Sequence, residues 1–418
     1  MARIIQLDSR FLLLFTGQLV SILGSSAATF ALTFEIFSRT GSTAQLAIAQ
    51  AAITFGTIYL APMAGSISDH FARRSVLISC NTILAILAMS MAGLSQTEAL
   101  STPIAIAPVL LVNGAVSACV TITFQVVIGS IERLGDRTRA NATYSVIESA
   151  PVIAGPLLGA LVFSLGVPIF WVFVADAVSF GISVMAILLT DAGEARPRGV
   201  RSLRPFRGAR DGIRIIMADG DLRQVQLSFM FFNFFNGIAI ASVTALLILI
   251  GGSSTLGITN AMGGVGLLIG ALTIKAVMKS TRPARLVPLS MMLGGLLGRV
   301  ALAATSITGA AAFCVFARNL TTQSTNSPLT SLWQGIVDPD VQGAVFGARR
   351  LLGQGLYPFA QFMGGLIPVL LVAHSAVSHD QALRLVLATA GVMEIVIAIL
   401  LMRSRAVDRL DQRLSIQP

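Results

Sequence analysis

The stretch Gly65-Ser-Ile-Ser-Asp69-His-Phe-Ala-Arg73-Arg74 joins two long apolar runs, residues 43–67 and 75–95. Each run is long enough to cross a bilayer as a helix, which needs about 20 apolar residues. The charged loop between them is short and mainly basic, as cytoplasmic loops of membrane proteins are. This alternation of apolar run and short charged loop predicts a membrane protein built from α-helices.

The composition of the whole chain leads to the same conclusion. Of its 418 residues, 55% are apolar and only 11% are charged, and 38 glycines come in addition. Soluble domains contain about 25% charged residues, and so little polar surface cannot cover so much apolar volume. A soluble enzyme, a disordered chain, a secreted disulfide scaffold and a coiled coil are excluded. The three cysteines, Cys80, Cys119 and Cys314, lie in apolar runs and indicate no disulfide framework.

Twelve apolar segments form two sets of six, separated by one long polar segment. The first segment is too long for a signal peptide and is expected to remain as a span. We therefore expect an N-terminal bundle at 1–190, a basic linker at 191–224 and a C-terminal bundle at 225–418. Arginines between Arg196 and Arg210 are expected to touch anionic lipid head groups. The expected spans are 11–34, 43–67, 75–95, 103–130, 143–165, 168–190, 225–250, 256–278, 286–307, 309–333, 344–373 and 381–402.

The positive charges mark one side of the membrane. The net charge is +10, from 29 basic and 19 acidic residues. If both termini are cytoplasmic, Arg39 and Arg384 lie in outer loops, Arg299 and Arg318 lie within spans, and the other 25 basic residues fall on the cytoplasmic side. This asymmetry follows the positive-inside rule, so the positive charge predicts orientation and no nucleic-acid partner.

The two sets of six spans also resemble each other at a nearly constant offset. Two glycine pairs are separated by 205 residues and an aspartate pair by 204. Such internal repeats are typical of secondary transporters, whose substrate site is expected near the midplane between the repeats. The matched positions are Gly65 with Gly270, Gly159 with Gly364, and Asp136 with Asp340.

The loop quoted first resembles the loop signature of the major facilitator superfamily. The signature is Gly, three residues, Asp, a basic residue, one residue, Gly and two basic residues. His70 and Ala72 depart from it, and the matching residues are Gly65, Asp69, Arg73 and Arg74. The resemblance implies an all-α integral membrane protein with twelve transmembrane helices in two pseudo-symmetric six-helix bundles. It also implies a monomer in the bacterial cytoplasmic (inner) membrane, with no cofactor.

A second element, Gly155-Pro156-Leu-Leu-Gly159-Ala160, is similar to the Gly-Pro-x-x-Gly-Gly element of antiporters and exporters in that superfamily, with Ala160 in place of the last glycine. Gly155, Pro156 and Gly159 are expected to act as a hinge, or as ordinary small-residue packing. Stretches 17–24, 173–180 and 333–346 resemble the macrolide-efflux and siderophore-exporter branch.

The loop residues are expected to form a cytoplasmic latch. The Asp69 carboxylate can accept hydrogen bonds from a helix N-terminus near residues 343–347. Arg73 or Arg74 can pair with an acidic residue, Glu132 or Asp136, at the end of the fourth span. Positive-inside charge alone would also explain the arginines, but not Asp69.

Acidic residues within spans are functional candidates because burying a charge in lipid is unfavourable. Glu35, Glu148 and Asp176 are the candidates for carrying a proton, an activity that the resemblance implies. Glu35 also precedes Arg39 by four residues, so an ordinary helical ion pair is equally expected. Glu394 lies on a span that is usually peripheral in this family and is expected to be a packed, neutral acid.

Arg318 and Arg299 are the basic residues within spans, and an arginine there suits an anionic substrate such as a carboxylate or hydroxamate. Polar side chains recur at helical spacing on five spans and are expected to face a cavity, with interhelical hydrogen bonding as the alternative. The expected substrate contacts, beside the two arginines, are Gln18, Ser21, Asn113, Ser117, Thr121, Asn233, Asn236, Asn319, Gln323, Asn326, Gln354, Tyr357 and Gln361.

These observations favour a secondary active exporter of a siderophore, peptide-type metabolite or drug, coupled to protons and working by alternating access. An importer of a similar solute is the alternative. An intramembrane enzyme would need a cluster of ligands, and His70, His374 and His379 have no metal-binding spacing. A receptor would normally carry a soluble output domain, and a primary pump would carry an ATP-binding loop, which the sequence lacks.

Overall fold

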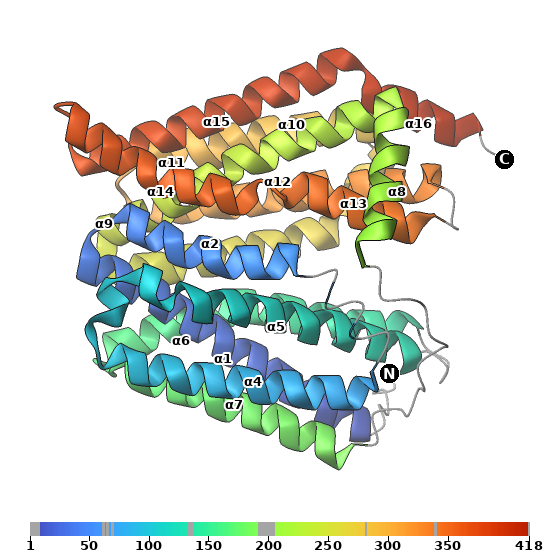
Figure 1. The fold of residues 1–418 in the computed structure, drawn as a ribbon. Coiled ribbons are helices and arrows are strands. Elements are labelled where there is room, and N and C mark those ends of the chain that lie inside the picture. Colours follow the sequence, from blue (N-terminus) through green and yellow to red (C-terminus); the bar gives the residue numbers. More distant parts are fainter. Residues whose placement is uncertain are drawn as a thin grey trace, which may run out of the picture. The chain divides into compact units, whose positions relative to one another are not determined.

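The computed structural model of the chain is built from helices (Figure 1). It describes residues 9–60, 63, 67, 71–131, 137–190, 205–280, 282–337 and 341–416, and no strand occurs among them. Contacts divide the chain into two compact units, one of residues 1–35 and 55–203 and one of residues 36–54 and 204–418.

In the first unit, α4 and α7 lie side by side (Figure 1). Leu77 and Leu84 of α4 and Phe180 and Ile187 of α7 are part of its buried core. The helices that contribute to this unit are α1 (Ser9–Thr40), α2 (Thr43–Tyr59), α4 (Arg73–Ser95), the short 3-10 helix η1 (Glu98–Ser101), α5 (Pro103–Ile131), α6 (Arg137–Ser164) and α7 (Ile169–Leu189). The end of α1 and most of α2 belong to the second unit.

In the second unit, α10 lies beside both α12 and α15 (Figure 1). Its helices are α8 (Pro205–Ala218), α9 (Gly220–Ser280), α10 (Pro283–Gly295), η3 (Leu296–Val300), α11 (Ala301–Ala304), α12 (Thr308–Ile336), α13 (Gln342–Gln354), α14 (Tyr357–His374), α15 (His379–Ser404) and α16 (Ala406–Ile416). Each of the twelve predicted spans has a helix over most of its described residues.

The 61-residue helix α9 contains two of the predicted spans, 225–250 and 256–278. Its backbone leaves the helical conformation at Gly251 and at Gly252, where φ is 65° and ψ is −153°. Only glycine adopts this conformation without steric strain. The glycine pair thus ends one predicted span and begins the next.

Eight stretches of the described residues are long and apolar enough to cross a membrane, and one of them, Gly220–Ile274, holds two predicted spans. The three predicted spans outside these stretches are α2, α6 and α12. Helix α12 is long but polar, because it carries Arg318 and the polar residues that follow it. A polar helix of this length requires protein or water beside it rather than lipid.

The segment from Ile36 to Thr54 belongs to the second unit because it packs against α14. The Thr43 hydroxyl donates a hydrogen bond to the Gly365 carbonyl at 2.9 Å. A Cβ atom on Gly365 would lie 2.2 Å from the Cβ of Ala47, so the glycine permits this close approach.

The predicted linker contains an ordered part, helix α8. Ile216 of α8 is fully buried with Trp333 and Leu410 in the core of the second unit. Helix α16 is fixed to the start of α9 by ion pairs, in which Arg413 lies 2.7 Å from Asp219 and 2.7 Å from Asp221. This end of the second unit is held by apolar packing and charge together.

Candidate functional site

A buried ion pair connects α12 and α15 in the second unit. Nη1 of Arg318 lies 2.9 Å from Oε2 of Glu394, and Nη2 lies 3.1 Å from Oε1. Arg318 is 8% exposed and Glu394 is 0% exposed. Two parallel hydrogen bonds between a guanidinium and a carboxylate are the strongest geometry available to such a pair. Glu394 is packed, as expected, and lies within ion-pair distance of Arg318.

A second arginine, Arg299, lies beside this pair. Its Nη2 donates a hydrogen bond to Oδ1 of Asn236, and its Nε lies 4.0 Å from Oε1 of Glu394. Arg299 is only 4% exposed, and its Nε has no hydrogen-bond partner among the described residues. Arg299 belongs to η3, a five-residue π-helix, and such bulges occur frequently at functional sites.

Asn236 of α9 connects the two arginines. Its Oδ1 accepts hydrogen bonds from Arg299 and from Nη2 of Arg318, the latter at 3.0 Å. Its Nδ2 donates to the Tyr357 hydroxyl at 3.3 Å. The ring of Phe232 lies 5.0 Å from Cζ of Arg318, which is cation–π distance. We call Arg299, Arg318, Glu394, Asn236 and Tyr357 the arginine cluster.

The arginine cluster holds two guanidinium groups and one carboxylate. Both arginines share the one carboxylate, so the cluster has one more basic group than acidic groups, and a buried charge is unfavourable unless it is paired. Asn236 and Tyr357 are only half-buried, whereas both arginines and Glu394 are buried. The cluster is least covered at Asn236 and Tyr357.

Glycines make room for the two arginines. A Cβ atom on Gly298 would lie 2.6 Å from Cβ of Arg318, and one on Gly294 would lie 2.7 Å from its Nη1. A Cβ atom on Gly391 would lie 2.7 Å from Cβ of Arg299. Because real Cβ atoms do not come this close, the helices can approach here only as long as these positions remain glycine.

The other predicted substrate contacts of the second unit lie outside the arginine cluster and differ from one another in burial. Asn319, Gln323 and Asn326 are half-buried on α12, and Gln323 donates to the Ser327 hydroxyl at 3.2 Å. Asn233 donates to the Gly353 carbonyl at 2.9 Å, so it serves helix packing. Gln361 is buried and Gln354 is exposed.

In the first unit, the predicted proton carrier Asp176 is buried at 5% exposure. The Ser25 hydroxyl donates to its Oδ1 at 3.0 Å, and the Ser179 hydroxyl lies 3.5 Å from the same atom. Its partners among the described residues are hydroxyl groups, and no described basic residue pairs with it. Such a carboxyl group can hold a proton without leaving a basic partner unpaired.

The other predicted acids differ from Asp176. Glu35 is half-buried and Arg39 is exposed. The side chain of Glu148 lies outside the described residues.

The predicted polar stripes of the first unit are also on helices. Gln18 and Ser21 of α1 are buried, at 3% and 1% exposure. Asn113 and Ser117 of α5 are half-buried, and Thr121 is exposed and donates back to the Ser117 carbonyl at 2.9 Å. The Thr121 bond lies within its own helix, so it is not the interhelical hydrogen bond that was the alternative to a cavity.

The predicted hinge residues lie where α6 meets α1. A Cβ atom on Gly155 would lie 2.2 Å from the Ser26 hydroxyl oxygen, and one on Gly159 would lie 2.6 Å from the Phe30 ring. Pro156 between them is buried. These glycines therefore allow close helix packing, and the hinge stays a prediction.

Of the predicted latch, Gly65 and Asp69 lie outside the described residues. Arg73 and Arg74 are half-buried at the start of α4. Nη2 of Arg74 donates to the Leu188 carbonyl at 2.8 Å, near the end of α7. A basic side chain is favourable there, because the last carbonyl groups of a helix lack partners within it.

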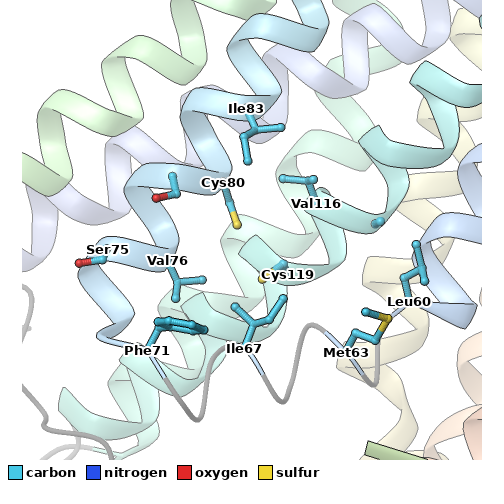
Figure 2. Close-up of a pocket in the computed structure, with 12 residues that line it drawn as sticks. Leu60, Met63, Ile67, Phe71, Ser75, Val76, Cys80, Ile83, Val116 and Cys119 are labelled. Carbon is cyan, nitrogen blue, oxygen red and sulfur yellow. The ribbon is translucent and has the colours of Figure 1, made fainter. Parts of the chain in front are cut away.

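A separate cavity of about 420 Å³ lies in the first unit. Figure 2 shows the sulfur of Cys80 near Val116, with Ile67 and Phe71 on another side. The described lining residues contribute alkyl, aromatic, thioether and thiol groups and two serine hydroxyls, and none of them is charged. This cavity shares none of the predicted substrate contacts.

The helical fold, together with the buried polar and charged residues on its apolar helices, defines a membrane transporter. The model of the Major Facilitator Superfamily matches residues 14–361, and the chain belongs to that family. It is a transporter rather than an enzyme.

Solved structures show the same fold at low sequence identity. The nucleoside transporter NupG matches with a TM-score of 0.73 at 14% identity, covering 94% of this chain and 98% of that chain. A bacterial homologue of the iron transporter ferroportin, in an inward-facing state, matches with a TM-score of 0.73 at 17% identity, covering 95% and 100%. A bacterial homologue of the lysosomal transporter Spinster matches with a TM-score of 0.70 at 15% identity, covering 97% and 98%. No curated protein matches the sequence.

Sequence reasoning missed the partnership of Arg318 with Glu394. Both had been recognised as charges within spans, and their opposite signs were the available signal, since buried charges are usually paired. The π-helix at Arg299 and the ring of Phe232 beneath Arg318 gave no signal in the sequence.

Proposed function

We propose that the protein is a proton-coupled exporter of an organic molecule that carries anionic groups, such as a siderophore, a peptide-type metabolite or an acidic drug. The arginine cluster is the observation that carries this proposal, because its two buried guanidinium groups face a single carboxylate. A guanidinium binds carboxylate and hydroxamate groups through two parallel hydrogen bonds. The substrate's anionic group would supply the missing negative charge.

Proton coupling and export rest on different residues. Asp176 is the leading candidate for the proton carrier because it is buried and bonded by hydroxyl groups. Export rests on the similarity of residues 155–160 to the exporter element.

The remaining parts of the proposal concern the membrane. We expect a monomeric transporter in a bacterial inner membrane, with both termini on the cytoplasmic side. Its two six-helix bundles would open the polar stripes alternately to the two sides of the membrane. The basic linker would lie on anionic head groups, and its helix α8 presents Arg210 and Arg214 for that contact.

Transport in proteoliposomes tests the proposal. A pH gradient is imposed, and a panel is offered that contains a trihydroxamate siderophore, a carboxylate siderophore, a short acidic peptide and a cationic drug. An anionic compound should move against the flow of protons. Movement in the same direction as the protons would replace export by uptake, and a response limited to the cationic drug would contradict the anionic substrate class.

A further inference from the structure

Glu394 occupies the binding surface of Arg318 that an anionic substrate would need. We infer that Glu394 holds the place of the substrate on Arg318 in the empty transporter, and that it moves to Arg299 when the substrate's anionic group arrives. This inference rests on the proposed function, since it describes how the same cluster receives its ligand.

The geometry of the ion pair shows why the two carboxylates must compete. Both Nη atoms of Arg318 are directed at the two oxygens of Glu394, at 2.9 Å and 3.1 Å. The remaining bond of Nη2 goes to Asn236, and the Phe232 ring covers the guanidinium at 5.0 Å. A second carboxylate can adopt this two-bond geometry only after Glu394 has left it.

Arg299 offers the displaced Glu394 a new partner at short range. Its Nε is buried, has no hydrogen-bond partner among the described residues and lies 4.0 Å from Oε1 of Glu394. A buried donor without a partner is unfavourable, so a hydrogen bond from Nε to Glu394 removes this penalty. The displacement needed is a rotation of one side chain.

The charge balance favours the exchange. The titratable groups that face Glu394 are Arg318 from α12, Arg299 from η3 and Tyr357 from α14, and Asn236 faces it from α9 as a neutral group. The empty cluster holds two positive charges and one negative charge. With a singly charged substrate group on Arg318 and Glu394 on Arg299, each guanidinium has its own carboxylate, and the buried charges cancel.

The exchange predicts an unusual sign for a substitution in a binding site. Glu394→Gln removes the competing charge and should bind an anionic ligand about tenfold more tightly or better, since close charge pairs couple strongly. If Glu394 instead only positions Arg318, the same substitution should weaken binding. Glu394→Asp keeps the charge and the fold but retracts the carboxylate by one methylene, and should bind with intermediate affinity.

Isothermal calorimetry with citrate tests the inference, with trimethyl citrate as the uncharged control. Size-exclusion chromatography and thermal unfolding establish that each full-length variant is folded. The expected order of affinity for citrate is Glu394→Gln, then Glu394→Asp, then wild type. Arg299→Gln should weaken citrate binding more in the wild-type background than in the Glu394→Gln background, because only the wild type has a displaced carboxylate for Arg299 to receive.

Repeating the titrations in two buffers of different ionisation enthalpy distinguishes movement of Glu394 to Arg299 from protonation of Glu394. Movement to Arg299 predicts equal proton uptake in wild type and Glu394→Gln. Uptake of one proton that disappears in Glu394→Gln would overturn the inference, as would weaker citrate binding by both Glu394 variants. If neither wild type nor any variant binds citrate or trimethyl citrate, the anionic substrate class of the proposed function is contradicted instead.

Discussion

Arg318 and Glu394 are 76 residues apart in the sequence and form a buried two-bond ion pair between α12 and α15. A second buried arginine, Arg299, lies next to the same carboxylate at 4.0 Å. This relationship makes α15 part of the polar interior of the second unit. Under the proposed function, stability and ligand binding depend on the same charges.

The ion pair should be visible in stability. Arg318→Ala leaves Glu394 without its closest partner and should lower the free energy of unfolding by about 3–5 kcal/mol. The double variant Arg318→Ala/Glu394→Ala should be less destabilised than the two single changes together predict. Thermal unfolding in detergent measures both, and additive losses would show that the two residues do not interact.

Gly298, which leaves room for the side chain of Arg318, gives a second prediction. Gly298→Ala places a Cβ atom 2.6 Å from Cβ of Arg318, and overpacking of this kind costs about 1–3 kcal/mol. Gly309→Ala on α12 is the matched control, because a Cβ atom there meets nothing within 4 Å. Equal unfolding temperatures for the two variants would argue against the close approach of the helices.

Substitution of Asp176 should abolish transport driven by a pH gradient but leave substrate exchange intact. Asp176→Asn retains a hydrogen-bond acceptor for Ser25 but cannot carry a proton. We expect loss of accumulation driven by a pH gradient, with exchange of labelled for unlabelled substrate at equal concentrations retained. Glu35→Gln is the comparison, and the result would point to Glu35 as the carrier if that variant alone lost driven transport.

The cytoplasmic latch predicts an effect on rate rather than on affinity. Asp69→Asn weakens hydrogen bonds that a carboxylate accepts from a helix N-terminus. Turnover in proteoliposomes should fall while the concentration for half-maximal binding stays the same. A normal rate would remove Asp69 from the latch and leave the loop arginines as orientation signals.

The contact of α16 with the start of α9 should depend on pH. Burial alone would raise the pKa of Asp219, but backbone N–H groups of Leu222 and Asp221 and the Arg413 guanidinium lower this pKa overall. A lowered pKa contributes stability above the unfolded value of about 3.9 and loses it as the pH falls through the folded value.

Arg413→Ala should therefore lower the unfolding temperature at pH 7, and the difference from wild type should shrink below about pH 4. Arg403→Ala, a change near the end of α15, serves as the control. A difference from wild type that stays constant from pH 7 to pH 3 would show that Arg413 acts by packing rather than by charge.

Much of the fold could be predicted because it depends on local composition. The runs of apolar residues predicted the helices that the described parts of the twelve segments form. The division at the polar segment before residue 225 stays a prediction, and residues 36–54 belong to the second compact unit. The pairing of Arg318 with Glu394 could not be predicted in the same way, because it depends on how α15 packs against α12. The usual position of a span in the family says nothing about which side chain of another helix Glu394 meets.

The most direct test of the account is substrate exchange by the double variant Arg318→Gln/Glu394→Gln, for whichever anionic compound the wild-type protein transports. The variant removes the two charges together, so it should remain folded by size-exclusion chromatography and thermal unfolding. The account predicts that exchange of the anionic compound is lost while the variant stays folded. Exchange at the wild-type rate and half-saturating concentration would contradict it.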